Sequence, residues 1–274
     1  MSLPSPDTNR TCVVTGASSG IGSEIARQLA RRGLGVTLVA RREDRLRTLA
    51  DELSSTCNIR AEVVSCDLTE RSSRDRLAQA LDDRGLTVDV LVNNAGFGTT
   101  GLAHQMDRDR ELGMIRTNVE ALVDLCMIFG RGMADRGGGA ILNVASTAAF
   151  QPVPGQAAYA ATKSFVLSYS HSLRAELGRS GVSVTVLCPG PVDTEFADTA
   201  GFEAGEAEGA APKFMWIPAD RVAQEAVDGL ARGKAVVIPG LANRLTAIGG
   251  YFAPRRVVTS LVASRHPALQ RTRP

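Results

Sequence analysis

Short apolar segments alternate with longer amphipathic segments along most of this chain of 274 residues. The apolar segments have the length of buried β-strands, and the longer ones repeat apolar residues at helical spacing. Strands are expected at 11–16, 35–40, 61–68, 88–96, 139–146, 182–190 and 235–239. Helices are expected up to about 32, after a cap at Asp67 or Thr69, and over about 42–53, 105–132, 156–179 and 218–232. Seven strands alternating with six helices predict an α/β fold, a doubly wound seven-stranded parallel sheet in a single domain.

The composition excludes several classes of protein. With 44% hydrophobic and 22% charged residues, the chain is neither disordered nor collagen-like, and a net charge of +2 argues against a polycation that binds nucleic acid. The first ten residues lack the apolar core of a secretory signal, and the longest uncharged stretch, 137–162, is interrupted by Pro152 and Pro154. We therefore expect a cytoplasmic protein without a transmembrane segment.

The cysteines and histidines indicate neither disulfides nor a metal site. No C-x-x-C spacing occurs, so we interpret the cysteines as small core residues of a protein in a reducing compartment. His104, His171 and His266 are far apart and lack zinc-like spacing, so no metal is predicted. The five cysteines are Cys12, Cys57, Cys66, Cys126 and Cys188.

A glycine-rich turn follows the first expected strand and leads directly into a helix. Gly16 permits the tight turn, Gly20 lets a pyrophosphate approach the backbone, and Gly22 allows the helix to pack closely on the strand. The N-terminus of the helix would face the anion. This position predicts dinucleotide binding, although the same glycines also suit an ordinary turn. The candidate contacts are Gly16, Ser18, Ser19, Gly20, Ile21 and Gly22.

The end of the second expected strand bears on the choice of cofactor. An acidic residue there would bind the ribose hydroxyls of NAD, but the sequence has Arg41 and Arg42. Arg41 can donate a charge-assisted hydrogen bond to a 2′-phosphate, which favours NADP(H) over NAD(H). The alternative is that both arginines are solvated residues in the first turn of the next helix.

Asp67 follows the third expected strand, in Cys66-Asp67-Leu68. Its carboxylate can accept a hydrogen bond from an adenine amino group. It can equally serve only as the N-cap of the next helix, and both interpretations stay open.

Tyr159 and Lys163 are four residues apart, on one face of an expected helix. The chain has only three tyrosines and three lysines, so this spacing is informative. A phenol ordinarily has a pKa of about 10, and an ammonium one turn away lowers that pKa. The pair therefore predicts a general acid–base that works near neutral pH.

Ser146 lies at the end of the fifth expected strand, thirteen residues before Tyr159. A hydroxyl in that place can hold a substrate carbonyl and stabilise negative charge that develops on its oxygen. No histidine lies near Ser146 in sequence and Ser146 does not lie in a G-x-S-x-G elbow, so a serine hydrolase is disfavoured.

Several motifs together resemble the classical short-chain dehydrogenase/reductase family. They are TGASSGIG at 15–22, NNAG at 93–96, Asn118, Ser146, Y-x-x-x-K at 159–163 and PGPVDT at 189–194. The order and spacing are those of the family over about residues 10–240, which implies a Rossmann-type fold. Arg41 matches the NADP-preferring pattern, whereas Ser19 replaces the basic residue that some NADP-using members carry.

The resemblance implies roles for individual residues. Tyr159 would be the general acid–base, Ser146 would bind the substrate oxygen, and Lys163 would hold the nicotinamide ribose. Asn118 would fix a water in a proton relay, and Asn93 would tie neighbouring strands. Residues expected along the cofactor are Asn94, Ala95, Gly96, Val192 and Thr194. The resemblance also implies a homodimer or homotetramer.

The chain divides, on these expectations, into an N-terminal arm (1–10), a dinucleotide-binding catalytic domain (11–240) and a basic C-terminal extension (241–274). Within the domain, 197–217 is a candidate substrate lid or an ordinary loop. The extension carries six arginines and no acidic residue, which leaves a net charge of −4 on the rest. It suits either an anionic partner, such as a phospholipid surface, coenzyme A or an acyl carrier, or simple packing on the domain.

We expect an NADP(H)-dependent oxidoreductase that interconverts a carbonyl and a secondary alcohol. The mouth of the site would be formed by 97–104, 147–157 and 194–217, and its apolar residues favour a lipophilic substrate such as a 3-oxoacyl thioester or a steroid. Those residues are Phe150, Phe196, Phe202, Phe214, Met215 and Trp216. The alternatives are core packing of these side chains, and an inactive protein that senses the cofactor with the same fold.

Overall fold

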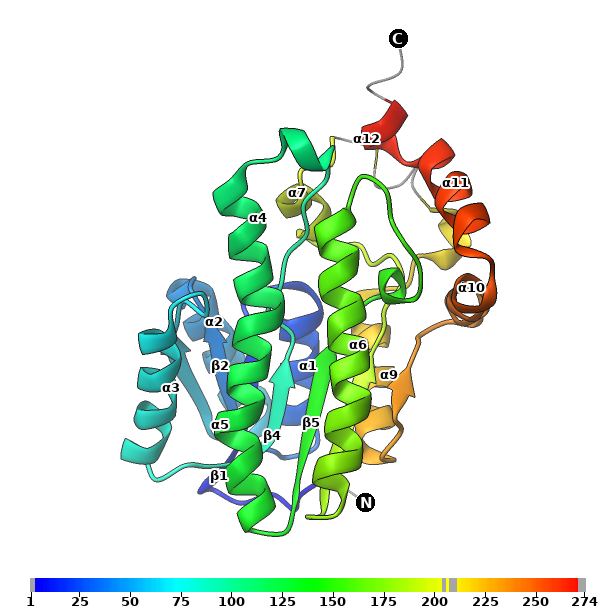
Figure 1. The fold of residues 1–274 in the computed structure, drawn as a ribbon. Helices are drawn as coiled ribbons and strands as arrows, with labels where there is room; N and C mark the ends of the chain where they lie inside the picture. Colours follow the sequence, from blue (N-terminus) through cyan, green and yellow to red (C-terminus); the bar gives the residue numbers. More distant parts are fainter. Residues whose placement is uncertain (1–2, 204–205, 207–210, 271–274) are drawn as a thin grey trace.

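The computed structural model describes residues 3–203, 206 and 211–270 (Figure 1). Strands and helices alternate from Arg10 onward, as the sequence predicts. The strands are β1 (Arg10–Thr15), β2 (Val36–Ala40), β3 (Ala61–Ser65), β4 (Thr87–Asn93), β5 (Gly139–Val144), β6 (Val182–Leu187) and β7 (Val236–Val237). The α-helices are α1 (Gly20–Ala30), α2 (Glu43–Cys57), α3 (Arg71–Asp83), α4 (Arg108–Ile115), α5 (Ala121–Asp135), α6 (Ala157–Gly178), α7 (Phe196–Ala200), α9 (Ala219–Ala231), α10 (Leu241–Phe252), α11 (Arg255–Arg265) and α12 (Pro267–Gln270).

The strands form one parallel sheet in the order β3-β2-β1-β4-β5-β6-β7. The predicted doubly wound seven-stranded sheet is therefore confirmed. Strand β1 pairs with both β2 and β4, so the connections leave in opposite directions on its two sides. Such a switch point leaves an open crevice at the carboxyl ends of the strands, where ligands bind in sheets of this kind. Strand β7 is shorter than expected, because Pro239 has no backbone N–H to donate.

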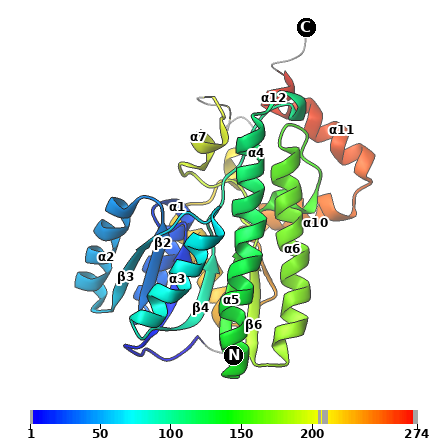
Figure 2. The ribbon, with the colours of Figure 1, turned by 60° about the vertical axis from the view of Figure 1, so that its left-hand side comes forward.

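Helices cover both faces of the sheet (Figures 1 and 2). One face packs against α1, α2 and α9, which contribute Ile25, Leu46 and Val222 to a buried core. The other face packs against α3, α5 and α6, through residues such as Leu77 and Leu125. Each strand is apolar on both sides for this reason. Among the described residues, no helix combines the length and the apolar character needed to cross a bilayer.

The expected helix over 105–132 is interrupted in the structure. A short 3₁₀-helix, η1 (Ala103–Gln105), precedes α4, and one π-helical turn, η2 (Arg116–Glu120), joins α4 to α5. Single π turns inside α-helices occur often at functional sites. This turn contains Asn118, one of the predicted site residues.

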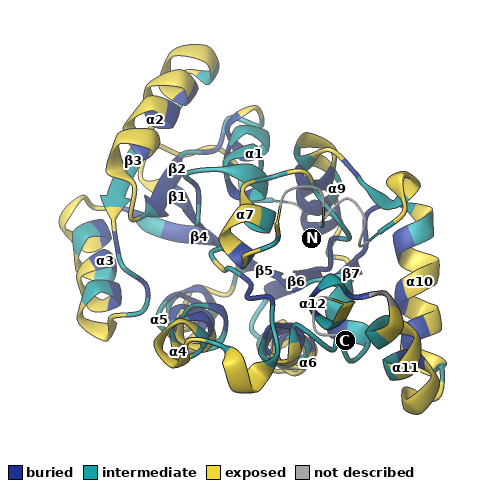
Figure 3. Cartoon of the chain, turned by 90° about the horizontal axis from the view of Figure 1, so that it is seen from above, coloured by how far each residue is buried: buried dark blue, intermediate teal, exposed yellow. Residues whose placement is uncertain are grey.

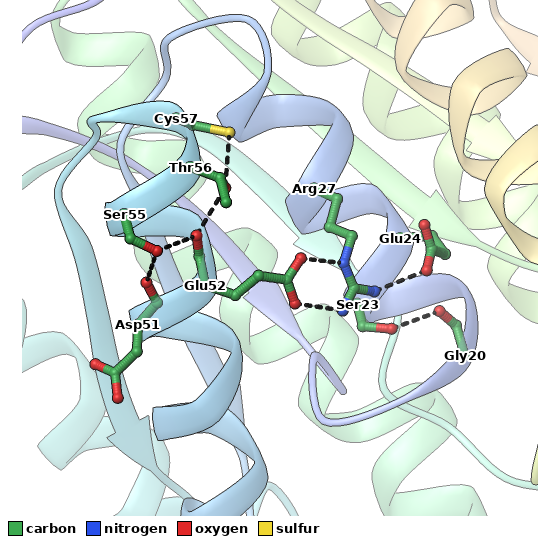
Figure 4. A network of polar contacts seen from close by, with 9 residues as sticks. All are labelled: Gly20, Ser23, Glu24, Arg27, Asp51, Glu52, Ser55, Thr56 and Cys57. Atoms are coloured by element: carbon green, nitrogen blue, oxygen red, sulfur yellow. Dashed lines mark hydrogen bonds and ion pairs between the residues drawn. The ribbon is translucent and has the colours of Figure 1, made fainter.

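Helix α2 is held against α1 by a polar network (Figure 4). Arg27 on α1 donates two hydrogen bonds to the Glu52 carboxylate, of 2.7 and 2.8 Å, and a third of 2.7 Å to Glu24. Planar, bidentate pairs of this kind are directional. The network orients α2 and therefore the residues between β2 and α2, which include Arg41 and Arg42.

The described part of the C-terminal extension forms α10, α11 and α12, beside the carboxyl edge of β6 and β7 (Figure 1). Pro254 separates the first two of these helices, since it is the N-cap of α11. Gly249 and Gly250 lie inside α10. Two of the six arginines, Arg271 and Arg273, lie outside the described residues.

The cysteines are free thiols, and four of the five are buried. Burial raises the pKa of Cys66 to about 11 and that of Cys126 and Cys188 to about 12, and it also raises the pKa of Cys12. Cys57, at the end of α2, is partly exposed. Most of the cysteines are therefore small core residues, as predicted.

Candidate active site

The glycine-rich turn lies above the switch point, between β1 and α1. Gly16 and Gly20 have φ angles of +66° and +57°, in the region that favours glycine. A Cβ at Gly22 would lie 2.4 Å from both Asn94 Nδ2 and the Gly16 carbonyl oxygen, so only glycine fits. Ser19 is the N-cap of α1, and its side chain makes no capping hydrogen bond.

A set of hydrogen bonds from the end of β4 fixes the base of this turn. Asn94 Nδ2 donates to the carbonyl oxygens of Thr15 and Gly16, at 3.0 and 3.3 Å. The Thr15 hydroxyl accepts from the backbone N–H groups of Asn94 and Ala95, both at 3.0 Å, and donates to the Val92 carbonyl. The structure therefore places Asn94 beneath the turn, where its amide is bound to backbone. Thr15, which sequence reasoning did not single out, organises this junction.

These residues fit a dinucleotide. The cradle is kept open by glycines whose Cβ atoms would collide with backbone or with Asn94, and α1 begins directly at Gly20. A phosphate at that point would meet backbone N–H groups and the positive end of a helix dipole. Within the described residues, no cluster of three or more potential metal ligands occurs.

The arginines after β2 occupy the outer end of the crevice. Arg42 donates to the hydroxyls of Ser18 and Ser19, at distances of 2.8 to 3.2 Å, and pairs with Glu195 at 2.8 Å. Arg45 pairs with the other oxygen of Glu195 at 2.5 Å, and the two arginines lower the pKa of that carboxyl to about 2. Arg41 is exposed at the tip of β2.

The sequence favoured Arg41 for the phosphate contact and left open whether Arg42 is a solvated residue. The contacts of Arg42 with both serines of the glycine-rich turn add it to the candidate set. Only its position, one residue after Arg41, was a signal in the sequence.

Asp67 forms a local turn after β3. Its Oδ1 accepts from the Thr69 backbone N–H at 2.9 Å and from the Thr69 hydroxyl at 2.7 Å. The pKa of Asp67 is lowered, because these two hydrogen bonds and the charge of Arg41 outweigh the opposing effect of burial. The N-cap of α3 is Glu70, so the expectation that Asp67 or Thr69 caps this helix is wrong.

Tyr159 and Lys163 lie on the buried face of α6, in its first two turns. The Lys163 Nζ is 5.8 Å from the centre of the Tyr159 ring and donates to the Val144 carbonyl oxygen at 3.0 Å. A Cβ at Gly96 would lie 3.4 Å from Lys163 Nζ, so the glycine leaves room for this ammonium group. The predicted pair thus faces the crevice above β4 and β5.

The pKa values of the pair correct one expectation. Burial raises the pKa of Tyr159 to about 12, and a hydrogen bond with Ser146 offsets only part of this rise. Burial also lowers the pKa of Lys163 to about 8. Burial is the larger of the two causes, so the pKa of Tyr159 is raised in this structure, where the sequence had led us to expect a lowering by the neighbouring ammonium.

Ser146 begins the 3₁₀-helix η3 (Thr147–Phe150), two residues after β5 ends. Its Oγ accepts a hydrogen bond of 3.1 Å from the Ala148 backbone N–H. The same hydroxyl interacts with the Tyr159 phenol. The strand end and the helix start therefore converge, as the spacing of thirteen residues suggested.

Asn118 connects three segments around the site. Its Oδ1 accepts from the Phe97 N–H at 3.2 Å, while Nδ2 donates to the Phe97 carbonyl at 3.0 Å and to Thr162 Oγ1 at 3.1 Å. A Cβ at Gly96 would lie 2.8 Å from Asn118 Oδ1. The side chain is thus fully used in fixing the loop after β4 against α6.

Asn93 lies directly opposite Asn143 in the pairing of β4 with β5. Its Nδ2 donates to Asn143 Oδ1 at 2.9 Å, and Asn143 in turn donates to Ser170 on α6 at 3.0 Å. The expected structural role of Asn93, which ties neighbouring strands, agrees with this geometry.

The segment after β6 closes one side of the site. The ring of Phe196 on α7 lies 5.4 Å from the Tyr159 ring, and a Cβ at Gly20 would lie 3.1 Å from the Thr194 methyl group. Val192 packs at the margin of the core. The residues just before the candidate lid, Thr194 and Phe196, thus lie next to the glycine-rich turn and to the phenol. Residues 204–205 and 207–210 of the lid lie outside the described part of the chain.

Of the six aromatic and Met side chains expected at the mouth, Phe196 packs its ring against Tyr159. Phe150 packs against Tyr251 at 6.4 Å and Phe202 against His266 at 6.2 Å, both in contact with the C-terminal extension. Trp216 donates to the Ala211 carbonyl, and Phe214 is 75% exposed. Phe196 is therefore the expected lining residue that touches the phenol.

The family model described as short chain dehydrogenase matches residues 10–203. An uncharacterized oxidoreductase of Staphylococcus epidermidis is 36% identical over 197 residues, which are 72% of this chain and 83% of that protein. A putative ketoacyl reductase of Streptomyces coelicolor is 38% identical over 191 residues, 69% of this chain and 73% of the other. A solved short-chain dehydrogenase from Sphingobium yanoikuyae, in complex with NADPH, is 34% identical with a TM-score of 0.78, and the match covers 88% and 92% of the two chains.

Proposed function

Since the chain belongs to the short-chain dehydrogenase family and is an alcohol/carbonyl oxidoreductase, we propose that it is an NADP(H)-dependent enzyme that interconverts a carbonyl and a secondary alcohol on a lipophilic substrate. The observation that carries the proposal is the convergence of Tyr159, Lys163 and Ser146 beside a glycine cradle at the switch point of the sheet.

The cofactor contacts are assigned from the geometry. The N–H groups around Ser19, Gly20 and Ile21 would hold the pyrophosphate, and Arg41 with Arg42 would hold the 2′-phosphate. Solved relatives with NADPH bound support this choice. When bound, the nicotinamide supplies or accepts the hydride. The remaining predicted contacts are Gly16, Ser18, Gly22, Asp67, Asn94, Ala95, Gly96, Val192 and Thr194.

In the reductive direction, the Tyr159 phenol donates a proton to the substrate oxygen, and the Ser146 hydroxyl holds that oxygen. A phenol with a raised pKa is fully protonated at neutral pH, which suits a proton donor. The reverse direction needs a phenolate, which positive charge near the ring would stabilise. Lys163, whose ammonium is desolvated, contributes such charge from within the site.

The substrate class is proposed from the walls of the site. The ring of Phe196 lies on Tyr159, and Phe150 and Phe202 stand on the two adjoining segments. Apolar walls of this kind favour lipophilic ketones, of which 3-oxoacyl thioesters and steroids are examples. The alternative of an inactive cofactor sensor is disfavoured, because Tyr159, Lys163, Ser146 and Asn118 are all present and adjoin one another.

We also propose that the enzyme is a homo-oligomer. Large apolar side chains on α4, α5 and α6 are left exposed by the part of the chain that the structure describes. They are Leu112, Ile115, Met127 and Phe165.

The decisive test replaces Tyr159 by phenylalanine. Loss of general acid catalysis should lower kcat by about 10²–10⁴-fold, while the affinity for NADPH changes little. NADPH oxidation with a panel of acyl, steroid and simple ketones measures the first, and fluorescence titration the second. Tyr169→Phe is the matched control, because it removes a phenolic hydroxyl elsewhere on α6. Wild-type rates in Tyr159→Phe would refute the assignment.

A further inference from the structure

The large apolar side chains of α10 are exposed to solvent, whereas a helix that only packs on a domain would bury them. Its buried residues are Asn243, Ala247 and Gly250, at the spacing of one helical face. The opposite face carries large exposed side chains, with Leu241 70% and Phe252 79% exposed. The exposed set on α10 is Leu241, Leu245, Ile248, Tyr251 and Phe252. The inner face is therefore small and polar, and the outer face is large and apolar.

Exposed stretches run along both α10 and α11 (Figure 3). Val257 and Leu261 on α11 are 60% and 52% exposed. Phe214 is exposed on the 3₁₀-helix η4 (Lys213–Met215), which contacts α10, and Asn243 donates to the Met215 carbonyl at 3.0 Å. Exposed apolar side chains gathered on successive elements in this way mark an interaction site in a protein that is otherwise well packed.

The charges of the same region are all positive. Arg244, Arg255 and Arg256 are exposed, and the sequence from 241 to 274 contains no acidic residue. The rest of the chain carries a net charge of −4, so positive charge is concentrated here. An apolar helix face edged by arginines is the pattern of a helix that lies in the interface of an anionic bilayer.

We propose that the outer face of α10 and α11 docks on an anionic phospholipid surface, with the apolar side chains entering the lipid and the arginines meeting the headgroups. A second copy of the chain is a poorer occupant. A symmetric contact would bring the same three arginines of both copies together, with no carboxylate in either extension to pair with them. A bilayer instead offers both an apolar interior and negative charge.

The proposed docking face adjoins the mouth of the site. On its inner side α10 packs against η3, where a Cβ at Gly250 would lie 2.6 Å from Gln151 Oε1 and Tyr251 meets Phe150 edge-on. Resting on the proposed function, this arrangement places the mouth next to the lipid from which a lipophilic ketone would come. Docking itself does not depend on that function.

The test is cosedimentation of the full chain with vesicles. Vesicles of phosphatidylcholine containing a quarter phosphatidylglycerol are compared with vesicles of phosphatidylcholine alone. We expect the chain to bind the anionic vesicles and to bind the neutral vesicles more weakly. Leu245→Ser and Phe252→Ser should each weaken binding about tenfold, and Arg255→Gln and Arg256→Gln about fivefold each.

A matched control lies elsewhere on the surface. Arg179→Gln removes an exposed charge at the far end of α6 and should leave vesicle binding unchanged. Circular dichroism and ketone reduction in detergent-free buffer show whether each variant is folded. Tyr159→Phe should retain vesicle binding, which separates failure of docking from failure of the proposed activity.

Three results would overturn the proposal. They are absence of binding to anionic vesicles, binding that the α10 variants leave unchanged, and binding that only the arginine variants weaken. The last would indicate a purely electrostatic anion site. If Leu245→Ser and Phe252→Ser change the oligomeric state measured by light scattering instead, the face is a contact between copies.

Discussion

The two ends of the crevice above the sheet differ in how far their polar groups are buried. At the catalytic end, Tyr159, Lys163 and Asn118 are buried, and their polar atoms bind backbone or one another. At the opposite end, Arg42 and Glu195 are exposed and form ion pairs in contact with water. Burial makes each polar group costly to replace, whereas exposed charges exchange partners readily. We therefore expect large effects of substitution at the first end and small ones at the second.

The largest loss of stability should come from Asn118→Leu. The change leaves both the N–H and the carbonyl of Phe97 without their partner, which should lower the free energy of unfolding by about 3 kcal/mol. Urea denaturation measures this loss. Arg116→Leu, an exposed position in the same π turn, is the control and should cost little. Equal stability of the two variants would show that burial at this end matters less than the comparison implies.

The second test compares the stability of Lys163→Met with that of the wild type at several pH values, because the buried lysine makes this difference depend on pH. Burial lowers the pKa of Lys163 from 10.5 to about 8, so the unfolded chain binds more protons between these values. The contribution of Lys163 to stability therefore rises with pH across this window and is least favourable below it. Between about pH 7.5 and 9.5, the wild type should gain about 2 kcal/mol relative to Lys163→Met, measured by urea denaturation.

The control for this measurement is Lys234→Met, which removes an exposed lysine. Its stability difference from the wild type should not vary over the same pH range. A flat difference for Lys163→Met as well would contradict the burial of a desolvated ammonium.

The smallest effects are expected at the exposed end. Arg41→Gln and Arg42→Gln should each weaken NADPH binding about tenfold and leave NADH binding unchanged, because only NADPH carries the 2′-phosphate. Fluorescence titration with both cofactors measures the ratio. Glu195→Gln is the control, since it breaks the ion pair of Arg42 without removing a positive charge. Equal losses for both cofactors would refute the phosphate assignment.

Much of the fold was predictable, because buried parallel strands are apolar on both faces and stand out in the sequence. The π turn at Asn118 was not, since it depends on contacts with Phe97, far away along the chain. The length of β7 also escaped prediction, because its pairing with β6 ends at Val237, two residues before Pro239. Local sequence patterns indicate where a helix or strand forms, whereas contacts with residues distant in the sequence determine where it ends or is interrupted.

The residues of the site were predictable from the sequence, but their burial and its effect on their pKa values were not. The four-residue spacing correctly placed Tyr159 and Lys163 together, but spacing carries no information on burial, and desolvation reversed the expected direction of the Tyr159 pKa. Arg42 was undervalued because its partner Glu195 is 153 residues away. The arginines and apolar residues of the extension were visible in the sequence, but only the structure shows which of them face outward.

The cysteines differ in their access to solvent, so their reactivity shows whether the chain is folded. All five lie within the described residues, and folding withdraws four of them while Cys57 stays within reach of solvent. Thiolates are the species that react with maleimides, and a buried thiol with a raised pKa rarely forms one. A maleimide dye can therefore be attached to Cys57, at the end of α2, without mutagenesis. Unfolding exposes the other four thiols, so a larger number of dyes per molecule indicates a larger fraction of unfolded chains.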